Sequence, residues 1–485
     1  MESKDLLSIL PAVALIGGAL LVVAVDVLFN HDKRNAASEF LSYAAIVVSF
    51  AAVVWPLVSS DKGAIEGFGR AVRLDPLALF LSLAILAATG LMIILSTDSL
   101  KDRSVPAGEY HGLVLFGASG MLLLVEAQEL ITFFIAIEIL SLSVYILSGL
   151  FRKDARSNEA AVKYFVIGSF ATGFLLYGMA LLYGATGTLR IPEMKLNGSL
   201  GSLGLAILAI GLAFKVGAVP FHMWVADVYE GAPTCVTAFM SVAVKAAGFG
   251  AFVRVLLTVG EGSAESWRPI LSGLALATMI VGNLMALWQR SVKRMLAYSS
   301  VAHTGYVLVA LAAAGEPGGA KDAASAAVFY LFAYTFMTLG AFAFVIYAGK
   351  GGRDAEDLDD YAGLASRRPV AALAMTVFMV SLAGIPPAAG FFAKFLVFKA
   401  AMAAGDTTLV VVGVLTSAVS VYYYLRVAVY MYMHAPAAEP LEEKPSPNVG
   451  MVVLAAAAFT LYLGVLPGRF LEQSFRAVGS LLLSR

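Results

Sequence analysis

The sequence has little charge and almost no cysteine. Only 14% of its 485 residues are Asp, Glu, Lys or Arg, whereas soluble domains usually carry about 25%. The single cysteine, Cys235, excludes an internal disulfide and any zinc site or iron–sulfur cluster held by several cysteines of this chain. Lys plus Arg equals Asp plus Glu, at 33 each, so no excess of positive charge points to nucleic acid as a partner.

Motifs of soluble enzymes are also missing. The chain contains no P-loop, no dinucleotide-binding glycine pattern after a strand, no HExxH motif and no nucleophile elbow. Apolar residues dominate instead: they make up 60% of the sequence, and the mean hydropathy is +0.84. A membrane-spanning helix needs roughly 20 mostly apolar residues. The composition therefore predicts an all-α polytopic membrane protein embedded in the lipid bilayer.

About fourteen apolar segments have the length of a spanning helix, and short polar connections join them. Loops after odd-numbered segments hold more Lys and Arg than loops after even-numbered ones. Because basic loops stay in the cytoplasm, we predict a multi-pass protein of the inner (plasma) membrane with both termini on the outer, periplasmic side. The segments are 6–29, 38–58, 74–96, 109–126, 128–150, 157–184, 200–227, 233–259, 269–289, 291–314, 322–348, 368–402, 406–434 and 448–467.

Two of these segments contain helix-breaking residues. Pro220 interrupts the seventh segment, and Pro386 and Pro387 interrupt the twelfth. Proline has no N–H to donate, and its ring clashes with the carbonyl four residues earlier. We therefore predict broken helices near 217–221 and 384–388. Backbone groups freed in this way must face protein or water, because lipid offers them no partner.

The two broken segments suggest an internal repeat. In each, proline interrupts a long apolar run, so helices four to eight and nine to thirteen would form two inverted five-helix repeats, an arrangement typical of transporters. We accordingly divide the chain into four parts. They are three N-terminal helices at 1–108, a first repeat at 109–259, a second inverted repeat at 260–434, and helix fourteen with a tail at 435–485.

Several ionisable residues lie inside the predicted helices, where a cation costs about 2.5–3.5 kcal/mol on insertion scales. We interpret Arg254 and Lys399 as side chains that extend to the membrane interface, as long basic side chains commonly do. Six others are candidates for proton transfer, because apolar sequence or a helix break surrounds them. They are Glu138, Lys163, Lys215, Lys245, His303 and Lys394.

Lys215 and Lys394 lie beside the two predicted breaks. A buried lysine releases its proton more readily than an exposed one, so freed carbonyls and water would let it change protonation state. A packing kink with a satisfied lysine is the alternative for Lys215. Lys245 and His303 lie between the breaks among small residues that leave room for water, and His303 could instead be a core histidine bonded to a serine.

Glu138 and Lys163 lie on neighbouring predicted helices, the fifth and the sixth. Lys163 is the expected partner of Glu138. Such a pair could act as a switch that releases a proton when it loosens, or it could be a purely structural ion pair.

Four segments resemble the antiporter-like membrane subunits of respiratory complex I. They are VPFHMWVADVYEGAPT at 219–234, AYSSVAHTGY at 297–306, GIPPAAGFFAKF at 384–395 and VYYYLR at 421–426. The strings DVYEGAPT and YYYLR resemble the subunit N branch of NADH–quinone oxidoreductase more than its L and M relatives. Ala226 departs from the pattern, because the family usually has proline there.

This resemblance implies a proton-translocating subunit of NADH–quinone oxidoreductase without a redox centre of its own. FMN, iron–sulfur clusters and quinone would sit on partner subunits, and the partners would be the other antiporter-like and small membrane subunits. The family's proton path would run through Glu138 of the fifth helix, Lys163 of the sixth, Lys215 of the broken seventh, Lys245, His303 and Lys394 of the broken twelfth.

Two other functions stay open. The chain could be a subunit of a cation/proton (Na⁺/H⁺) antiporter, or the membrane subunit of a related hydrogenase or dehydrogenase complex. Co-purification with flavin and iron–sulfur subunits would separate the redox complexes from the antiporter.

Overall fold

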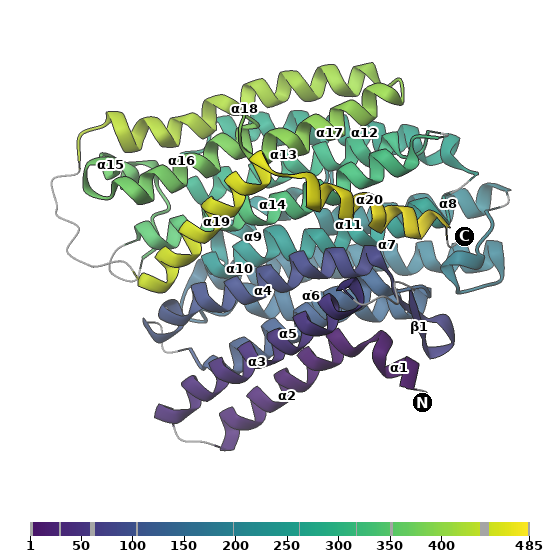
Figure 1. The fold of residues 1–485 in the computed structure, drawn as a ribbon, viewed down its shortest axis with the longest axis horizontal. Coiled ribbons are helices and arrows are strands. Elements are labelled where there is room, and N and C mark those ends of the chain that lie inside the picture. The colour runs from purple at the N-terminus through teal and green to yellow at the C-terminus, as the bar shows by residue number, and fades with distance from the viewer. Residues whose placement is uncertain are drawn as a thin grey trace.

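The computed structural model is a bundle of helices whose axes run in roughly the same direction (Figure 1). It describes residues 3–28, 31–58, 64–102, 105–196, 198–260, 262–316, 318–349, 353–436 and 446–483. The elements are α1 (Ser3–Ser8), α2 (Leu10–Leu28), α3 (His31–Val58), β1 (Ile65–Gly67), η1 (Phe68–Arg70), β2 (Val72–Leu74), α4 (Pro76–Asp102), α5 (Ala107–Glu126), α6 (Leu130–Ser148), α7 (Ala155–Thr186), η2 (Ile191–Glu193), α8 (Gly198–Val216), α9 (Met223–Gly231), α10 (Thr234–Phe239), the π-helical turn η3 (Met240–Val244), α11 (Lys245–Thr258), α12 (Ala264–Leu287), α13 (Val292–Ala313), α14 (Ala320–Ala348), η4 (Leu358–Tyr361), α15 (Leu364–Arg367), α16 (Pro369–Ala383), α17 (Ala389–Ala403), α18 (Thr407–Met433), α19 (Pro447–Val465) and α20 (Gly468–Leu483).

Within the described residues, thirteen helices are long and apolar enough to cross a membrane. The predicted segment 368–402 is present as two shorter helices, α16 and α17, placed one after the other. Helix α1 and the end of α20 lie at the same end of the bundle (Figure 1). The all-α polytopic fold expected from the sequence is therefore confirmed.

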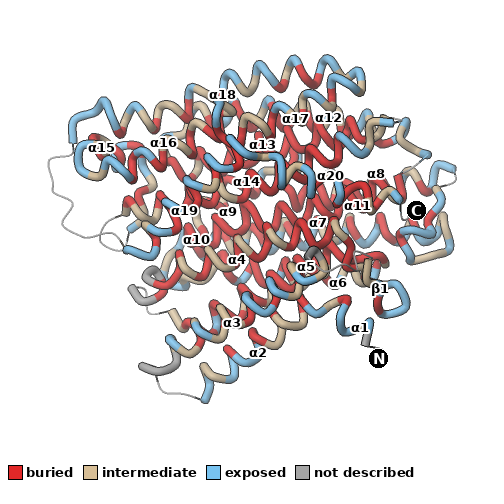
Figure 2. Tube along the Cα trace, in the orientation of Figure 1, coloured by how far each residue is buried: buried red, intermediate tan, exposed pale blue. Residues whose placement is uncertain are grey.

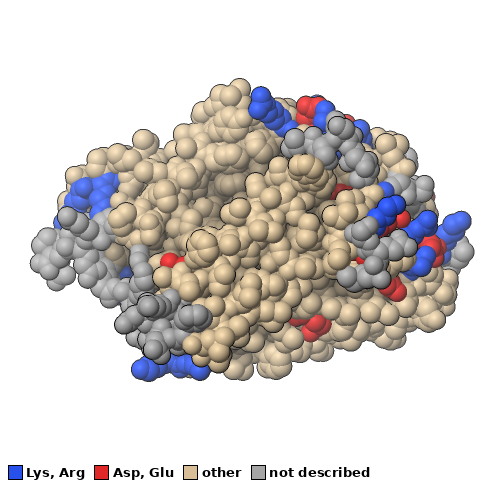
Figure 3. Space-filling model, turned by 60° about the horizontal axis from the view of Figure 1, so that its bottom comes forward, with Lys and Arg blue, Asp and Glu red and all other residues tan. Residues whose placement is uncertain are grey.

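The lateral surface of the bundle is apolar. Charged side chains gather towards the two ends, and the broad middle of the face in Figure 3 is mostly uncharged. Large apolar side chains such as Trp55, Phe170 and Leu415 are exposed on α3, α7 and α18. This surface suits lipid tails or the apolar helices of neighbouring subunits.

Two spans form the centre of the bundle, where burial is most complete (Figure 2). They are α13 and the stretch Thr234–Thr258, which comprises α10, η3 and α11, and both are buried over their whole apolar window. A helix that other helices surround on every side presents its polar side chains only to protein. Lys245 and His303 lie on these two spans.

Both predicted helix breaks are confirmed. Helices α8 and α9 are separated by residues 217–222, and α16 and α17 by residues 384–388. Gly217 and Gly384 have φ angles of +73° and +86°, in the left-handed region that glycine adopts without steric cost. Glycine therefore lets the chain leave each helix where proline prevents its continuation.

Several elements were not predicted. Strands β1 and β2 form an antiparallel hairpin that pairs Ile65 with Leu74, and three-residue strands are too short for a periodic signal. The turn η3 interrupts the eighth predicted helix. The tail after the fourteenth segment is helix α20, which packs on α4 and α14; its charged residues gave it too little apolar sequence to resemble a span.

The interpretation of Arg254 as an interfacial side chain is wrong. Its side chain is 1% exposed and forms a two-pronged ion pair with Asp75, at 2.9 and 3.0 Å. It also donates to the carbonyl of Val125, at 2.7 Å from Nη2 and 3.0 Å from Nε. Because Asp75 directly precedes α4, the pair joins α4, α5 and α11. Lys399 is exposed, as expected.

Replacing Arg254 with alanine should strongly destabilise the protein. Removing one partner of a buried ion pair leaves the other charge unpaired, which typically costs about 3–5 kcal/mol. Thermal unfolding of the purified protein should show a clearly lowered midpoint for Arg254→Ala. The midpoint of Lys399→Ala should be almost unchanged. The double variant Arg254→Met, Asp75→Leu should recover much of the loss. Equal midpoints for Arg254→Ala and wild type would contradict the structural role.

Candidate functional site

Lys215, at the end of α8, is buried against α6 and α7. Its Nζ donates to Ser141 Oγ at 2.7 Å and lies 5.6 and 5.9 Å from the ring centres of Tyr145 and Tyr164. Ser141 is one helical turn after Glu138 on α6, and the charge of Glu138 acts on Lys215. The first lysine therefore has a hydroxyl acceptor, two aromatic faces and a nearby carboxylate.

Lys245 is held by the central helix α13. Its Nζ donates to Thr304 Oγ1 at 2.8 Å and to the carbonyl of Ser300. Thr304 Oγ1 in turn donates to the carbonyl of Val216 at 2.8 Å. Because Val216 directly follows Lys215, one threonine hydroxyl joins the neighbourhoods of the two lysines.

His303 lies beside Thr304 on α13, and both of its ring nitrogens are bonded to tyrosine. Nδ1 is 2.6 Å from Tyr330 Oη, and Nε2 is 3.1 Å from Tyr424 Oη. The hydroxyl of Tyr424 also bonds Ser299 Oγ. Both Lys245 and Lys394 are near enough to His303 for their charges to act on it.

Lys394, on α17, binds the second broken helix. Its Nζ donates to the carbonyl of Ala383 at 3.0 Å and to Ser417 Oγ at 2.8 Å. It also lies 4.8 Å from the ring centre of Tyr306, whose ring contacts that of His303 with 5.7 Å between centres. Tyr306 therefore connects the environments of Lys394 and His303.

The two breaks present their free carbonyls in the same way. In a continuous helix the carbonyl of residue i accepts from the N–H of residue i+4. That position is Pro220 for Val216 and Pro387 for Ala383, and proline has no N–H. Both carbonyls accept side-chain donors instead, from Thr304 and Lys394 respectively.

The expected pair of Glu138 and Lys163 does not form. Lys163 Nζ binds Glu159 at 2.7 Å and Asp227 at 2.9 Å, whereas Glu138 Oε1 accepts from Thr172 Oγ1 at 3.0 Å. Thr172 and Lys163 are nine residues apart on α7, which corresponds to about 13–14 Å along the helix. Lys163 thus belongs to an ion-pair network that also includes Arg294, 3.0 Å from Asp227.

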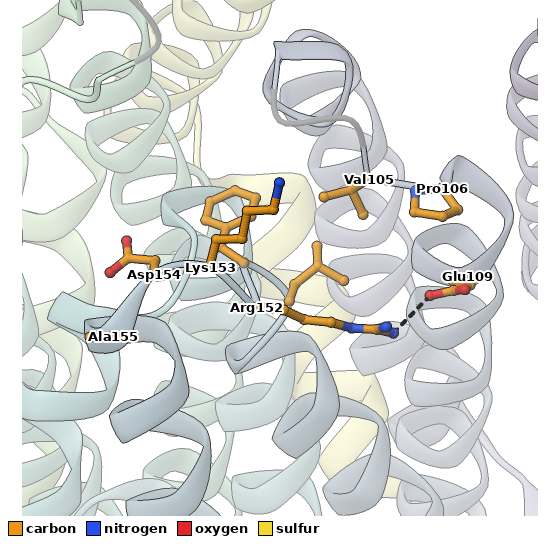
Figure 4. A pocket seen from close by; sticks show the side chains of 9 residues that line it. Val105, Pro106, Glu109, Arg152, Lys153, Asp154 and Ala155 are labelled. Carbon is orange, nitrogen blue, oxygen red and sulfur yellow. Dashed lines mark hydrogen bonds and ion pairs between the residues drawn. The ribbon is translucent and has the colours of Figure 1, made fainter.

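One surface cavity reaches a buried lysine, and another lies away from the buried lysines. A cavity of about 810 Å³, mostly apolar, lies over the break between α16 and α17 and reaches Lys394 and Ser417. Another, of about 630 Å³, lies between residues 105–109 and the turn before α7. Figure 4 shows Arg152 reaching across that second cavity to Glu109, at 3.2 Å. None of the buried lysines lines the second cavity.

Among the described residues, no group of three or more His, Cys, Asp or Glu side chains could hold a metal ion. The acceptors around the buried lysines are hydroxyls and carbonyls, joined by phenol rings. Hydroxyl groups both donate and accept hydrogen bonds, and carbonyl oxygens accept them. The chemistry that the arrangement supports is the movement of protons.

Comparisons with known proteins agree with this chemistry. The family model for the membrane domain of NADH:quinone oxidoreductase and Mrp antiporters matches residues 127–420. NADH-quinone oxidoreductase subunit N of Trichlorobacter lovleyi is 43% identical, over 98% of this chain and 98% of the relative. The Myxococcus xanthus subunit N is 42% identical over 99% of both chains.

This chain belongs to the NADH–quinone oxidoreductase subunit N family. The resemblance read from the sequence motifs is therefore confirmed. A chain of respiratory complex I from Thermus thermophilus has a TM-score of 0.82 at 33% identity, covering 95% of this chain and 98% of that one. A chain of the Mrp complex from Dietzia reaches a TM-score of 0.89 at 22% identity, which shows a shared fold alone.

The sequence did not single out the hydroxyl groups that form hydrogen bonds with the buried lysines and the histidine. Ser141, Thr304 and Ser417 each accept from a lysine, and Tyr330 and Tyr424 hold His303. Serine, threonine and tyrosine are common in membrane helices, so residue type alone gives no warning. The available signal was position: Thr304 directly follows His303, and Tyr424 lies within the VYYYLR motif.

Thr304→Val should weaken proton movement while keeping the fold. Valine has the shape of threonine without the hydroxyl, so Lys245 loses an acceptor and the carbonyl of Val216 loses its donor, each worth about 1–3 kcal/mol when buried. We expect proton translocation in proteoliposomes to fall about tenfold, which corresponds to roughly 1.4 kcal/mol. Thr304→Ser, which retains the hydroxyl, is the matched control. Unchanged translocation by Thr304→Val would contradict the connection.

Proposed function

We propose that this chain moves protons across the membrane as a subunit of NADH–quinone oxidoreductase. The observation that carries the proposal is a line of four buried titratable groups, Lys215, Lys245, His303 and Lys394, each of which is hydrogen-bonded to at least one hydroxyl group. An isolated cation inside a membrane is costly. A line of titratable groups, each hydrogen-bonded to a hydroxyl, is consistent with protons that are taken up and passed on.

Electrostatic repulsion would give the movement its direction. A charged lysine disfavours charging of its neighbour, so sites this close titrate together. Protonation of Lys245 or Lys394 would then expel a proton from the next group. Moving a proton against 100 mV costs about 2.3 kcal/mol, which is within the range that such coupling supplies.

The six candidate residues take different positions in this scheme. Glu138 would influence Lys215 at the start of the line, and Lys215, Lys245, His303 and Lys394 would exchange protons through water. Lys163 would act from outside the line, through its ion pair with Asp227, by holding α9 in place after the break.

The assembly would supply the energy and the electrons. FMN, iron–sulfur clusters and quinone would be bound by partner subunits, and the lateral surface of this chain would contact other membrane subunits. Both termini would face the outside of the plasma membrane. The two inverted repeats, 109–259 and 260–434, would each contribute one broken helix, between the N-terminal helices at 1–108 and the C-terminal part at 435–485.

Lys245→Ala and Lys394→Ala should each abolish most proton translocation while the complex assembles. Neither residue forms an ion pair among the described contacts, so the loss should come from proton transfer. The measurement is acidification of inverted membrane vesicles driven by NADH, normalised to the amount of assembled complex. Lys399→Ala removes a lysine from the same helix as Lys394 but from an exposed position, and it should translocate normally. Equal losses in all three variants would defeat the proposal.

Glu138→Ala should lower translocation, because Lys215 loses the carboxylate whose charge acts on it. Glu138→Asp keeps the charge and should keep part of the activity. Glu159→Ala removes a carboxylate that binds Lys163 and should have a smaller effect. Normal translocation by an assembled Glu138→Ala variant would remove Glu138 from the scheme.

A further inference from the structure

A polar stripe follows the buried face of α4. Asp75, directly before the helix, is followed at intervals of seven residues by Ser82, Thr89 and Ser96, and all four are fully buried. Seven residues are close to two helical turns, so these side chains share one face. None of these four residues belongs to the line of Lys215, Lys245, His303 and Lys394, which we call the lysine line.

Glu126 lies at the end of this stripe, as the last residue of α5. It is fully buried, and neither carboxyl oxygen has a hydrogen-bond partner among the described residues. Arg254 is nearby, but its hydrogen bonds go to Asp75 and to the carbonyl of Val125. A buried carboxylate without a partner is so unfavourable that the group keeps its proton instead. Burial without a hydrogen-bond partner therefore favours the neutral acid form of the Glu126 carboxyl group.

Glu126, Asp75 and Arg254 form a buried cluster. A series of charged groups connects this cluster to the surface. Arg73 Nε is 3.9 Å from Asp75, and another nitrogen of Arg73 is 3.8 Å from Glu66, which in turn pairs with Arg70 at 3.3 Å. Side-chain exposure rises in the same order, from 1% at Asp75 through 16% at Arg73 to 40% at Glu66 and 71% at Arg70.

The β1–β2 hairpin carries these outer charges and covers Glu126. The backbone N–H of Gln128 donates to the carbonyl of Ala71 at 2.9 Å, and Val72 pairs with Ala127. The turn that follows Glu126 is thus fixed beneath the hairpin. The hairpin lies at the same end of the bundle as α1 (Figure 1), the end that the proposed orientation places outside.

Arg254 lies on the same helix as Lys245, α11. Arg254 and Lys245 are nine residues apart on α11, about 13–14 Å along the helix axis. Ser82, about 10 Å from Asp75 along α4 by the same rise per residue, is buried, and its hydroxyl has no partner among the described residues. The turn η3, which directly precedes Lys245, packs on α4. The unpartnered hydroxyl of Ser82 thus lies on α4, the helix that follows Asp75 and also packs on the turn before Lys245.

We propose that Glu126 is a proton-release group that connects the buried lysine line to the outer aqueous face. Its carboxylic acid O–H bond breaks as the proton passes to a water molecule on the side of the hairpin residues Arg73 and Glu66. The carboxylate that remains lies beside Arg254 and is repelled by Asp75. A proton delivered through water from the Lys245 side then restores the acid. The inference rests on the proposed function and adds a place where protons leave the chain.

The test replaces the acid with its amide. Glu126→Gln keeps size and neutrality, so the fold should be retained, but it cannot release a proton. NADH-driven acidification of vesicles should fall at least tenfold, because a positioned acid–base group contributes about 100-fold or more to proton transfer. Glu126→Asp should retain part of the activity. Glu129→Gln is the matched control: this carboxylate lies three residues on and is only half buried, and its loss should change little.

A second readout reports the proton directly. Infrared difference spectra between the resting and NADH-driven complex should contain the C=O band of a protonated carboxylic acid, and Glu126→Gln should remove it. If Glu126→Gln fails to assemble, Glu126→Asp with a shifted band supports the inference, and an unchanged spectrum overturns it. Normal translocation by Glu126→Gln while Lys245→Ala is inactive overturns this inference alone. Normal translocation by both variants overturns the proposed function.

Discussion

An ammonium group inside a membrane needs acceptors, and in this protein side-chain hydroxyls and backbone carbonyls provide them. Proline at 220 and 387 frees the carbonyls of Val216 and Ala383. Lys394 binds the second carbonyl directly, and Lys245 reaches the first through Thr304. Thr304 and Lys394 thus supply side-chain donors to the two carbonyls that the prolines leave without a backbone partner.

The second constraint is complete burial of the central helices. Because α13 is surrounded by protein, the hydroxyl, imidazole and carbonyl groups on its successive turns can contact Lys245 on one side and the tyrosines around His303 on another. The same helix thus contributes to both breaks. A helix with one face in lipid could not place polar groups all around its circumference.

The sequence predicted the spans and breaks well, because both depend on local properties. Apolar length defines a span, and proline with glycine defines a break. It predicted pairing poorly, because pairing depends on how each helix is rotated. Lys163 was assigned to Glu138 as a neighbour in helix order, yet it faces Asp227, which lies beyond the first break. Arg254 was placed at the interface, although its partner Asp75 lies 179 residues away, beyond any local signal.

Proton movement along this chain requires water that joins Lys215, Lys245, His303 and Lys394 into one path. The most direct measurement is a cryo-electron microscopy structure of the assembled complex at a resolution that shows ordered water. The account predicts water molecules within hydrogen-bonding distance in each interval between neighbouring groups of this line. Intervals filled by tightly packed apolar side chains, with no ordered water between any two groups, would contradict it.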